Sequence, residues 1–135
     1  MTTLAVTAPA KINLHLQVLG RRRDGFHDVC TLLQSIDLSD EVLASSAGRG
    51  ATEFHVEPRG SAPAGNDNLV LKAAEALRRR TGTTEGAALV LKKKIPVGAG
   101  LGGGSADAAA TLVLLDALWK LHLGHSELVE IAAGL

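Results

Sequence analysis

The sequence predicts an α+β fold in two layers, and three observations predict it. Strand-like patterns dominate the first 56 of the 135 residues, whereas helix-like patterns dominate after residue 68. Hydrophobic residues make up 46% of the chain, which is enough for one domain with its own core. Aromatic residues make up only 2%, so that core must consist of aliphatic side chains.

The first half of the chain contains the predicted hairpin. Residues 4–8 are apolar, and Pro9 is expected to interrupt them. Residues 12–18 alternate between apolar and polar, which predicts a half-buried strand. A polar turn at 20–25 and a second strand at 27–37 follow, so the two strands are expected to pair.

Short strands are expected at 41–44 and 52–56, followed by the first helix. The helix is predicted over 69–80, because apolar residues recur there at helical spacing. Asn68 is in place to cap its N-terminus, and Gly82 is in place to end it.

The remaining elements surround a glycine-rich segment. A strand is predicted over 87–95, and Pro96 ends it. Residues 105–121 are rich in alanine and leucine and predict a buried helix. Ser126 is expected to cap a last helix that reaches Ala133.

Composition narrows the class of protein. The formal net charge is zero, which argues against a nucleic-acid partner, and the clusters 21–23, 78–80 and 92–94 are interpreted as solvated basic faces. The single cysteine, Cys30, is interpreted as a buried thiol. No apolar run is long enough to cross a membrane, and no signal peptide is apparent. We therefore expect a soluble, cytoplasmic protein without a membrane partner.

Residues 98–104 contain five glycines in seven positions, between a predicted strand and a predicted helix. Such a loop brings backbone N–H groups and the positive end of a helix dipole to one place. That arrangement favours binding of a phosphate group. The sequence therefore predicts a nucleotide-phosphate site at 98–106.

Alternative interpretations of the glycine loop remain open. Gly98-x-Gly100-x-x-Gly103 formally matches the dinucleotide fingerprint, but residues 117–123 lack the acidic residue expected near the ribose. A Walker-type loop would need a lysine after the last glycine, and none is there. A turn without a ligand is the third alternative, although ordering so many glycines costs conformational entropy.

Four segments resemble the GHMP small-molecule kinases, the group of galactokinase, homoserine kinase and mevalonate kinase. The glycine segment 96–109 is similar to their phosphate loop, and the segments 8–14, 20–27 and 66–70 are similar to other family motifs in the same order. The triple glycine is most similar to the branch that phosphorylates a cytidine-diphosphate-linked methylerythritol in the non-mevalonate isoprenoid pathway. The resemblance implies the family's N-terminal ATP-binding domain, with a mixed sheet packed on helices.

The resemblance also implies roles for individual residues. Lys11 matches a catalytic lysine beside the acceptor hydroxyl, and Asn13 matches a residue near the erythritol end of the substrate. Phe26 and His27 match the position that holds the cytosine ring, with phenylalanine in place of the family's tyrosine. A core aromatic is the alternative for Phe26.

ATP and Mg²⁺ are the implied cofactors. Ser105 is expected to cap the following helix or to contact a phosphate, and Asp107 is expected in the first turn of that helix. Asn68 matches a position near the adenine, with helix capping as its alternative. The expected cofactor-binding residues are Pro96, Val97, Gly98, Ala99, Gly100, Leu101, Gly102, Gly103, Gly104, Ser105, Ala106, Asp107 and Asn68.

The resemblance covers residues 1–135 but only about half of a family protein. The family's Gly-x-Asp-x-Pro segment, whose aspartate is implied either as the base or as a residue that orients the lysine, has no match here. We therefore expect an N-terminal fragment without the C-terminal domain, with some nucleotide affinity and little turnover. Exposed apolar surface is expected to favour self-association. A nucleotide-binding module without catalysis, including a Rossmann-like fragment, is the alternative function.

Overall fold

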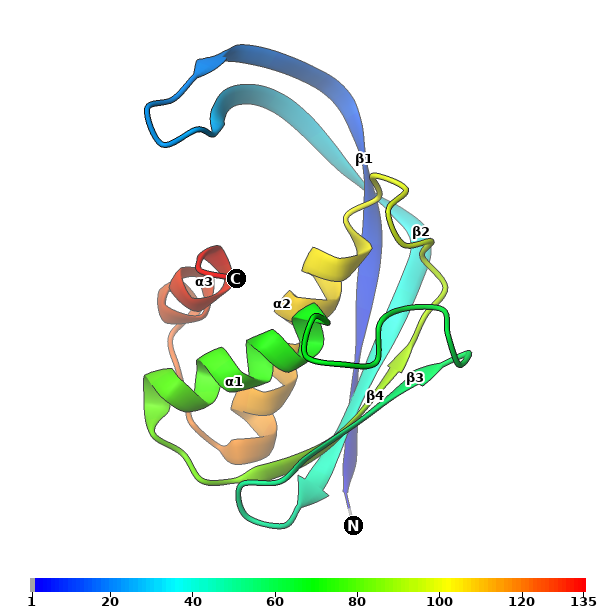
Figure 1. Cartoon of the computed structure of the whole chain (residues 1–135), viewed down its shortest axis with the longest axis vertical. Coiled ribbons are helices and arrows are strands. Elements are labelled where there is room, and N and C mark those ends of the chain that lie inside the picture. The colour runs from blue at the N-terminus through cyan, green and yellow to red at the C-terminus, as the bar shows by residue number, and fades with distance from the viewer. Residues whose placement is uncertain (1) are drawn as a thin grey trace.

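A four-stranded sheet is the frame of the molecule, and the computed structural model describes it within residues 2–135 (Figure 1). The long strands β1 (Thr3–Arg21) and β2 (His27–Ala47) pair antiparallel. The shorter strands β3 (Thr52–Glu57) and β4 (Gly86–Lys92) run parallel to each other. The strand order is β1-β2-β4-β3, so the sheet is mixed, as the family resemblance implies.

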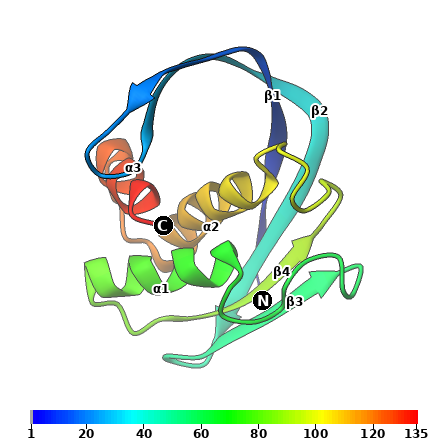
Figure 2. The same ribbon diagram turned by 45° about the horizontal axis from the view of Figure 1, so that its top comes forward.

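Three helices lie on one face of this sheet (Figures 1 and 2). They are α1 (Leu69–Thr81), α2 (Gly103–Trp119) and α3 (His125–Ala133). α2 contacts β1 and β2 and lies beside α1, while α3 contacts both other helices. The predicted two-layer α+β fold is therefore confirmed.

The first helix forms as the sequence predicts. The Asn68 side chain accepts a hydrogen bond from the Val70 backbone N–H at 2.9 Å, and Gly82 ends the helix with a φ of 69°. Both ends are thus satisfied by the expected residue types. The buried face of α1 consists of Val70, Ala73, Ala74 and Leu77.

Arg78 joins the helical layer to the sheet, which corrects its interpretation as part of a solvated face. Its guanidinium donates to the Ala51 carbonyl at 3.0 Å and lies 5.2 Å from the centre of the Trp119 ring. The Trp119 indole N–H donates to the Gly86 carbonyl at 3.2 Å. These bonds satisfy the polar atoms where α1 and α2 meet the ends of β3 and β4.

Strand β1 continues through Pro9, so the predicted interruption there is wrong. β1 lies at the edge of the sheet, and a shift in register separates Pro9 from Lys11. An edge strand tolerates proline because its outward N–H groups have no partner strand. The separate strand predicted at 41–44 is likewise wrong, because those residues belong to β2.

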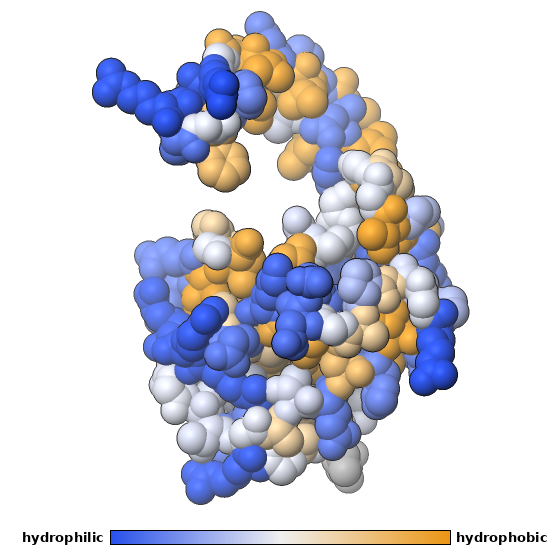
Figure 3. Space-filling view, in the orientation of Figure 1, coloured by the Kyte–Doolittle hydropathy of each residue, from blue (hydrophilic) through white to orange (hydrophobic). Residues whose placement is uncertain are grey.

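The distal part of the β1–β2 hairpin extends past the helices as a curved arm (Figure 1). We define this distal arm as residues 12–33. The prediction that its first strand is half-buried is wrong, because Leu14 and Leu16 are each 57% exposed. Cys30 is also exposed, against its interpretation as a buried thiol. Figure 3 shows hydrophobic atoms along this arm. Within the described residues, no helical layer covers either face of the arm, which the alternation of residue types alone does not indicate.

Two helix starts differ from the prediction. α2 begins at Gly103, and its N-cap is Gly102, so Ser105 is not a cap. α3 begins at His125 after Gly124, so Ser126 is not its cap either. Glycine is accepted at an N-cap almost as well as serine. Within residues 2–135, no helix is long and apolar enough to cross a membrane.

Candidate functional site

The glycine loop connects the end of β4 to the start of α2. Gly98, Gly100 and Gly102 have φ values of 74°, 74° and 71°, a region that disfavours residues with a Cβ atom. Gly102 has no side chain with which to cap α2. The first N–H groups of the helix are therefore free for a ligand, and the positive end of its dipole lies at the loop.

A pocket of about 370 Å³ lies beside this loop. Asn68 and Asp107, two of the predicted cofactor-binding residues, line it together with every residue from Pro96 to Ser105. Ala106 is not among the lining residues. The structure thus brings nearly all of these predicted residues together in one concave site.

Lys11 joins the sheet to the glycine loop. Its backbone N–H donates to the Leu101 carbonyl at 2.9 Å, and its ammonium donates to the Gly100 carbonyl at 3.0 Å. The side chain passes over Gly102, where an added Cβ would lie 3.0 Å from the Lys11 Cε atom. The predicted catalytic lysine therefore lies beside the predicted phosphate loop, although 89 positions separate it from Gly100.

Asn13 completes this part of the site. Its side-chain oxygen accepts a hydrogen bond from the Lys11 ammonium at 2.8 Å. Its amide nitrogen donates to the Thr31 hydroxyl on β2 at 2.8 Å. The two residues predicted from the N-terminal motif are thus in direct contact.

A buried charge cluster lies beneath the loop. The Lys93 ammonium donates to Asp40 at 2.6 Å and to Asp107 at 2.8 Å, and all three side chains are at most 4% exposed. The second Asp40 oxygen accepts from the backbone N–H groups of Lys94 and Ile95. The cluster therefore joins the start of the loop, β2 and α2.

The cluster corrects two interpretations from the sequence. Asp107 lies in the second turn of α2 rather than in the first, and it is buried. Lys93 is not part of a solvated basic face. Because β4 ends at Lys92 rather than at residue 95, the N–H groups of Lys94 and Ile95 are free to bind Asp40.

Burial and neighbouring charges shift the pKa values of these three groups in opposite directions. Burial raises the pKa of Asp107 to about 6, against the lowering effect of the Lys93 ammonium. Burial also raises the pKa of Asp40, but the hydrogen bonds from Lys93, Ile95 and Lys94 outweigh it and hold the pKa below its usual range. Burial lowers the pKa of Lys93, but its bonds to both carboxylates outweigh that and raise it. Among residues 2–135, one Asp107 oxygen is buried without a hydrogen-bond partner.

Sequence reasoning missed Lys93 and Asp40, although a signal for Lys93 exists. Lys93 follows Leu89 and Leu91 at alternate positions, in phase with the buried face of β4. A charged residue in that phase points inward and needs a partner. A comparable signal marks Asp40, which precedes the buried Val42 and Ala44 at alternate positions of β2.

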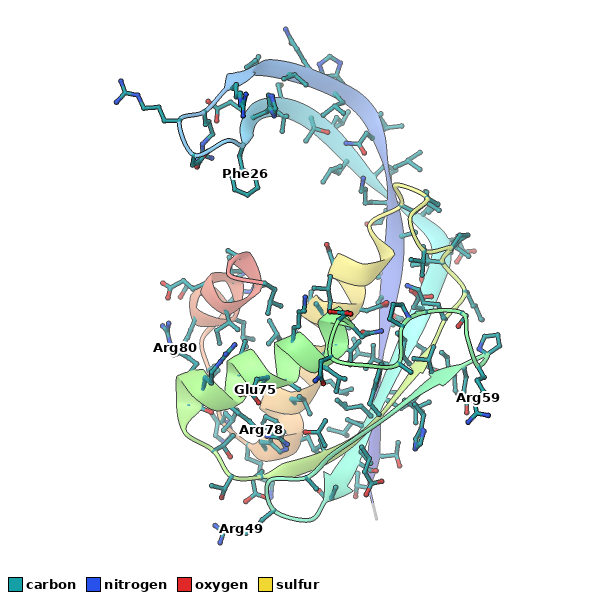
Figure 4. The ribbon with its side chains drawn as sticks, in the orientation of Figure 1. Phe26, Arg49, Arg59, Glu75, Arg78 and Arg80 are labelled. Atoms are coloured by element: carbon teal, nitrogen blue, oxygen red, sulfur yellow. The ribbon has the colours of Figure 1, made fainter. Side chains whose placement is uncertain are left out.

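Phe26 and His27 lie at the tip of the distal arm, apart from the pocket. Phe26 is 71% exposed, so its alternative as a core aromatic is wrong. Figure 4 shows its ring projecting from the tip into the concave side of the molecule. The turn is held by Asp24, which accepts from the Phe26 N–H at 3.1 Å and pairs with Arg22 at 2.8 Å. The two predicted substrate regions, at Asn13 and at Phe26 and His27, thus lie at the base and at the tip of the distal arm.

The comparison with protein families decides what this arrangement is. Residues 68–135, which include the glycine loop, match the family described as the GHMP kinases N terminal domain. This chain belongs to the GHMP kinase family. Solved GHMP structures share its fold: a mevalonate kinase is 15% identical, with a TM-score of 0.74 over 96% of this chain and 45% of that one.

Closer relatives carry a more specific name. A protein of Synechococcus sp., named 4-diphosphocytidyl-2-C-methyl-D-erythritol kinase, is 51% identical over 98% of this chain and 43% of its own length. A protein of Shewanella loihica with the same name is 48% identical over 95% of this chain and 45% of its own length. A crystal structure of 4-(cytidine 5'-diphospho)-2C-methyl-D-erythritol kinase is 36% identical, with a TM-score of 0.76 over 96% of this chain and 46% of that one. This GHMP chain therefore spans less than half the length of these relatives.

Proposed function

We propose that this GHMP chain binds ATP at the glycine loop and provides Lys11 for phosphoryl transfer to a hydroxyl of a cytidine-diphosphate-linked methylerythritol. The observation that carries the proposal is the contact between Lys11 and the loop at Gly100 and Leu101. The names of the relatives support the substrate. Binding ATP also fits the cytoplasmic location expected from the sequence.

Each part of the site has a task in this reaction. Backbone N–H groups of the loop and of the start of α2 bind the phosphates of ATP. The transferred phosphorus breaks its bond to the bridging oxygen of ADP and forms a bond to the substrate oxygen, which loses its proton. The Lys11 ammonium stabilises negative charge on the oxygen atoms involved. Within residues 2–135, the Lys11 ammonium contacts an amide oxygen and a carbonyl rather than a carboxylate, so we assign that proton to water.

The donor set fits Mg²⁺ carried by the nucleotide. Among residues 2–135, no group of three or more histidine, cysteine, aspartate or glutamate residues could hold a metal ion. Magnesium is commonly held by one or two protein oxygens together with substrate phosphates. Among the side chains that line the pocket, the Ser105 hydroxyl and the carboxylates of Asp67 and Asp107 are hard donors. When bound, Mg²⁺ neutralises charge on the phosphates.

At the far end of the concave side, the distal arm holds the cytidine end of the substrate. The exposed Phe26 ring offers a face for stacking on a base, and His27 offers a hydrogen-bonding group. The dinucleotide alternative has less support, because α2 leads to α3 rather than to a further parallel strand within the described residues.

A pair of crossed substitutions tests both ends of the site. Gly104 is exposed in the first turn of α2, so Gly104→Asp places a negative charge at the phosphates without disturbing the helix. We expect Gly104→Asp to weaken ATP binding about tenfold or more and to leave binding of cytidine diphosphate unchanged. Phe26→Ala should do the reverse, because stacking on a base is lost.

Calorimetric titration of each variant with each nucleotide measures the effect. Gly104→Asn, which has a similar size and no charge, is the matched control and should bind ATP nearly as the wild type does. Equal effects of Gly104→Asp and Gly104→Asn would contradict a phosphate site. Thermal stabilisation by NAD but not by ATP with Mg²⁺ would favour the dinucleotide alternative.

A further inference from the structure

Thr31 lies where the pairing of the hairpin is irregular. The register of β1 and β2 shifts between Asn13 and His15, which marks a bulge in β1. The Thr31 hydroxyl donates to the His15 carbonyl at this bulge, at 2.8 Å. Bulges commonly redirect side chains next to functional sites. The Thr31 hydroxyl thus uses its single proton in this bond, and toward another partner its oxygen can act only as an acceptor.

The bond that Thr31 accepts fixes the orientation of the Asn13 amide. A side-chain amide has one acceptor end and one donor end. Because the Thr31 oxygen accepts from the amide nitrogen of Asn13 at 2.8 Å, the amide oxygen faces the Lys11 ammonium, also at 2.8 Å. The opposite orientation would place N–H donors against the ammonium and remove the Asn13 acceptor, leaving the ammonium its bond to the Gly100 carbonyl.

Lys11 connects Asn13 to the phosphate loop. Its flexible four-carbon side chain needs anchoring points to hold the ammonium at one position. The Asn13 oxygen supplies one anchor and the Gly100 carbonyl supplies the other, at 3.0 Å. The hydrogen bonds therefore form one chain from the His15 carbonyl through Thr31, Asn13 and Lys11 to the glycine loop.

We propose that Thr31 is a positioning residue, which orients Asn13 and through it holds the Lys11 ammonium beside the phosphate loop. The proposal rests on the function proposed above, to which it adds a residue that none of the four family-like segments contains. A threonine in a strand would otherwise be explained by its β-branched shape alone. The hydroxyl and the shape can be separated by substitution.

The test compares Thr31→Val with Thr31→Ser. Valine keeps the β-branched shape and removes the hydroxyl, whereas serine keeps the hydroxyl. Lys11 acylation by a small amine-reactive ester, followed by mass spectrometry of peptides, reports whether the ammonium is held. We expect acylation of Lys11 to be several-fold faster in Thr31→Val and unchanged in Thr31→Ser. The exposed Lys72 serves as the internal control in every sample.

Side-chain amide NMR signals of Asn13 provide a second readout on the same variants. They should move in Thr31→Val and stay near their wild-type positions in Thr31→Ser. Where transfer from ATP is measurable, kcat should fall about tenfold in Thr31→Val, with the KM for ATP unchanged, because the loop itself is intact.

The outcomes separate the two proposals. Wild-type Lys11 acylation and Asn13 signals in Thr31→Val would overturn the role of Thr31, whatever the turnover. Faster Lys11 acylation and moved Asn13 signals in Thr31→Ser as well as in Thr31→Val would overturn it too, because the hydroxyl that serine keeps would then not be what holds Asn13. In a further outcome, the wild type fails to bind ATP while Lys11 acylation and the Asn13 signals still differ between Thr31→Val and Thr31→Ser. That result would contradict the proposed function but support the role of Thr31 as a positioning residue.

Discussion

At the scale of single residues, Gly102 combines two constraints that only glycine meets. Its φ of 71° disfavours any residue with a Cβ atom, and that atom would also lie 3.0 Å from Lys11 Cε. Gly104 has neither constraint, because an added Cβ would meet only Leu69, at 3.4 Å. The two glycines thus have different reasons to be present in the same loop.

Gly102→Ala should therefore destabilise the chain and displace Lys11, whereas Gly104→Ala should not. We expect Gly102→Ala to lower the free energy of unfolding by about 1–2 kcal/mol. Gly104→Ala should raise it by about 0.5–1 kcal/mol, because alanine is the better helix former. Urea unfolding measures both. Equal effects of the two substitutions would contradict the account of Gly102.

Asp107 predicts a dependence of stability on pH. Its pKa is about 6 in the folded chain against 3.8 ordinarily, so the folded chain binds more protons between these values. The free energy of unfolding should therefore fall as pH rises from about 4 to about 6 and stay level above that. Asp107→Asn removes the titrating group. From pH about 4 to about 6, the free energy of unfolding of the wild type should therefore fall by up to about 3 kcal/mol relative to that of the variant.

Urea unfolding of both proteins at a series of pH values between 4 and 7 checks this prediction. Asp40, whose pKa is lowered, loses its contribution only as pH falls below about 3.8, outside the window. Parallel stability curves for the wild type and Asp107→Asn would contradict the raised pKa.

At the scale of elements, the loop is stabilised from below by the Lys93 cluster. The cluster joins β2 through Asp40 to α2 through Asp107, and Asp40 also holds the first residues of the loop. Removing the cation would leave two buried carboxylates without their shared partner. The geometry of the glycine loop thus depends on a residue that does not belong to it.

Lys93→Met should lower the free energy of unfolding by about 3–5 kcal/mol. Lys92→Met is the matched control, because Lys92 pairs with Glu41 at the surface and should change stability very little. Thermal and urea unfolding of both variants compare them. Similar decreases in the free energy of unfolding for the two substitutions would show that burial of the charge cluster is not what makes Lys93 important for stability.

The sequence predicted these elements unevenly, for physical reasons. α1 follows from its apolar spacing and from Asn68, since both signals are local. The glycine loop is predicted because its composition is itself unusual. The exposure of the distal arm could not be predicted, because alternation shows that a strand has two faces but not whether a layer covers them. The contact between Lys11 and Gly100 depends on tertiary structure alone.

At the scale of the whole molecule, the curved arm and the helices enclose a concave side that is open to solvent (Figures 1 and 3). The phosphate loop and the hairpin tip face each other across the length of the arm. The arm carries exposed apolar side chains on β1, among them Leu16 and Val18, which are 57% and 60% exposed. This surface is the origin of the self-association that we propose for the chain.

Sedimentation velocity over a range of concentrations measures that association. We expect reversible association of the wild type at high concentration. The double substitution Leu16→Thr and Val18→Thr, which keeps strand-forming residues at solvent-exposed positions, should weaken it. A monomer at all concentrations, or association that the substitutions do not change, would contradict a role for the arm.

We propose the glycine loop beside Lys11 as the ATP site, and NMR titration examines this loop residue by residue. Backbone amide signals are followed as ATP with Mg²⁺ is added to the ¹⁵N-labelled chain. We expect saturable shifts that are largest from Gly98 to Ser105 and at Lys11, with little change at the hairpin tip. Absence of shifts, or shifts centred on the tip while the loop is unaffected, would contradict it.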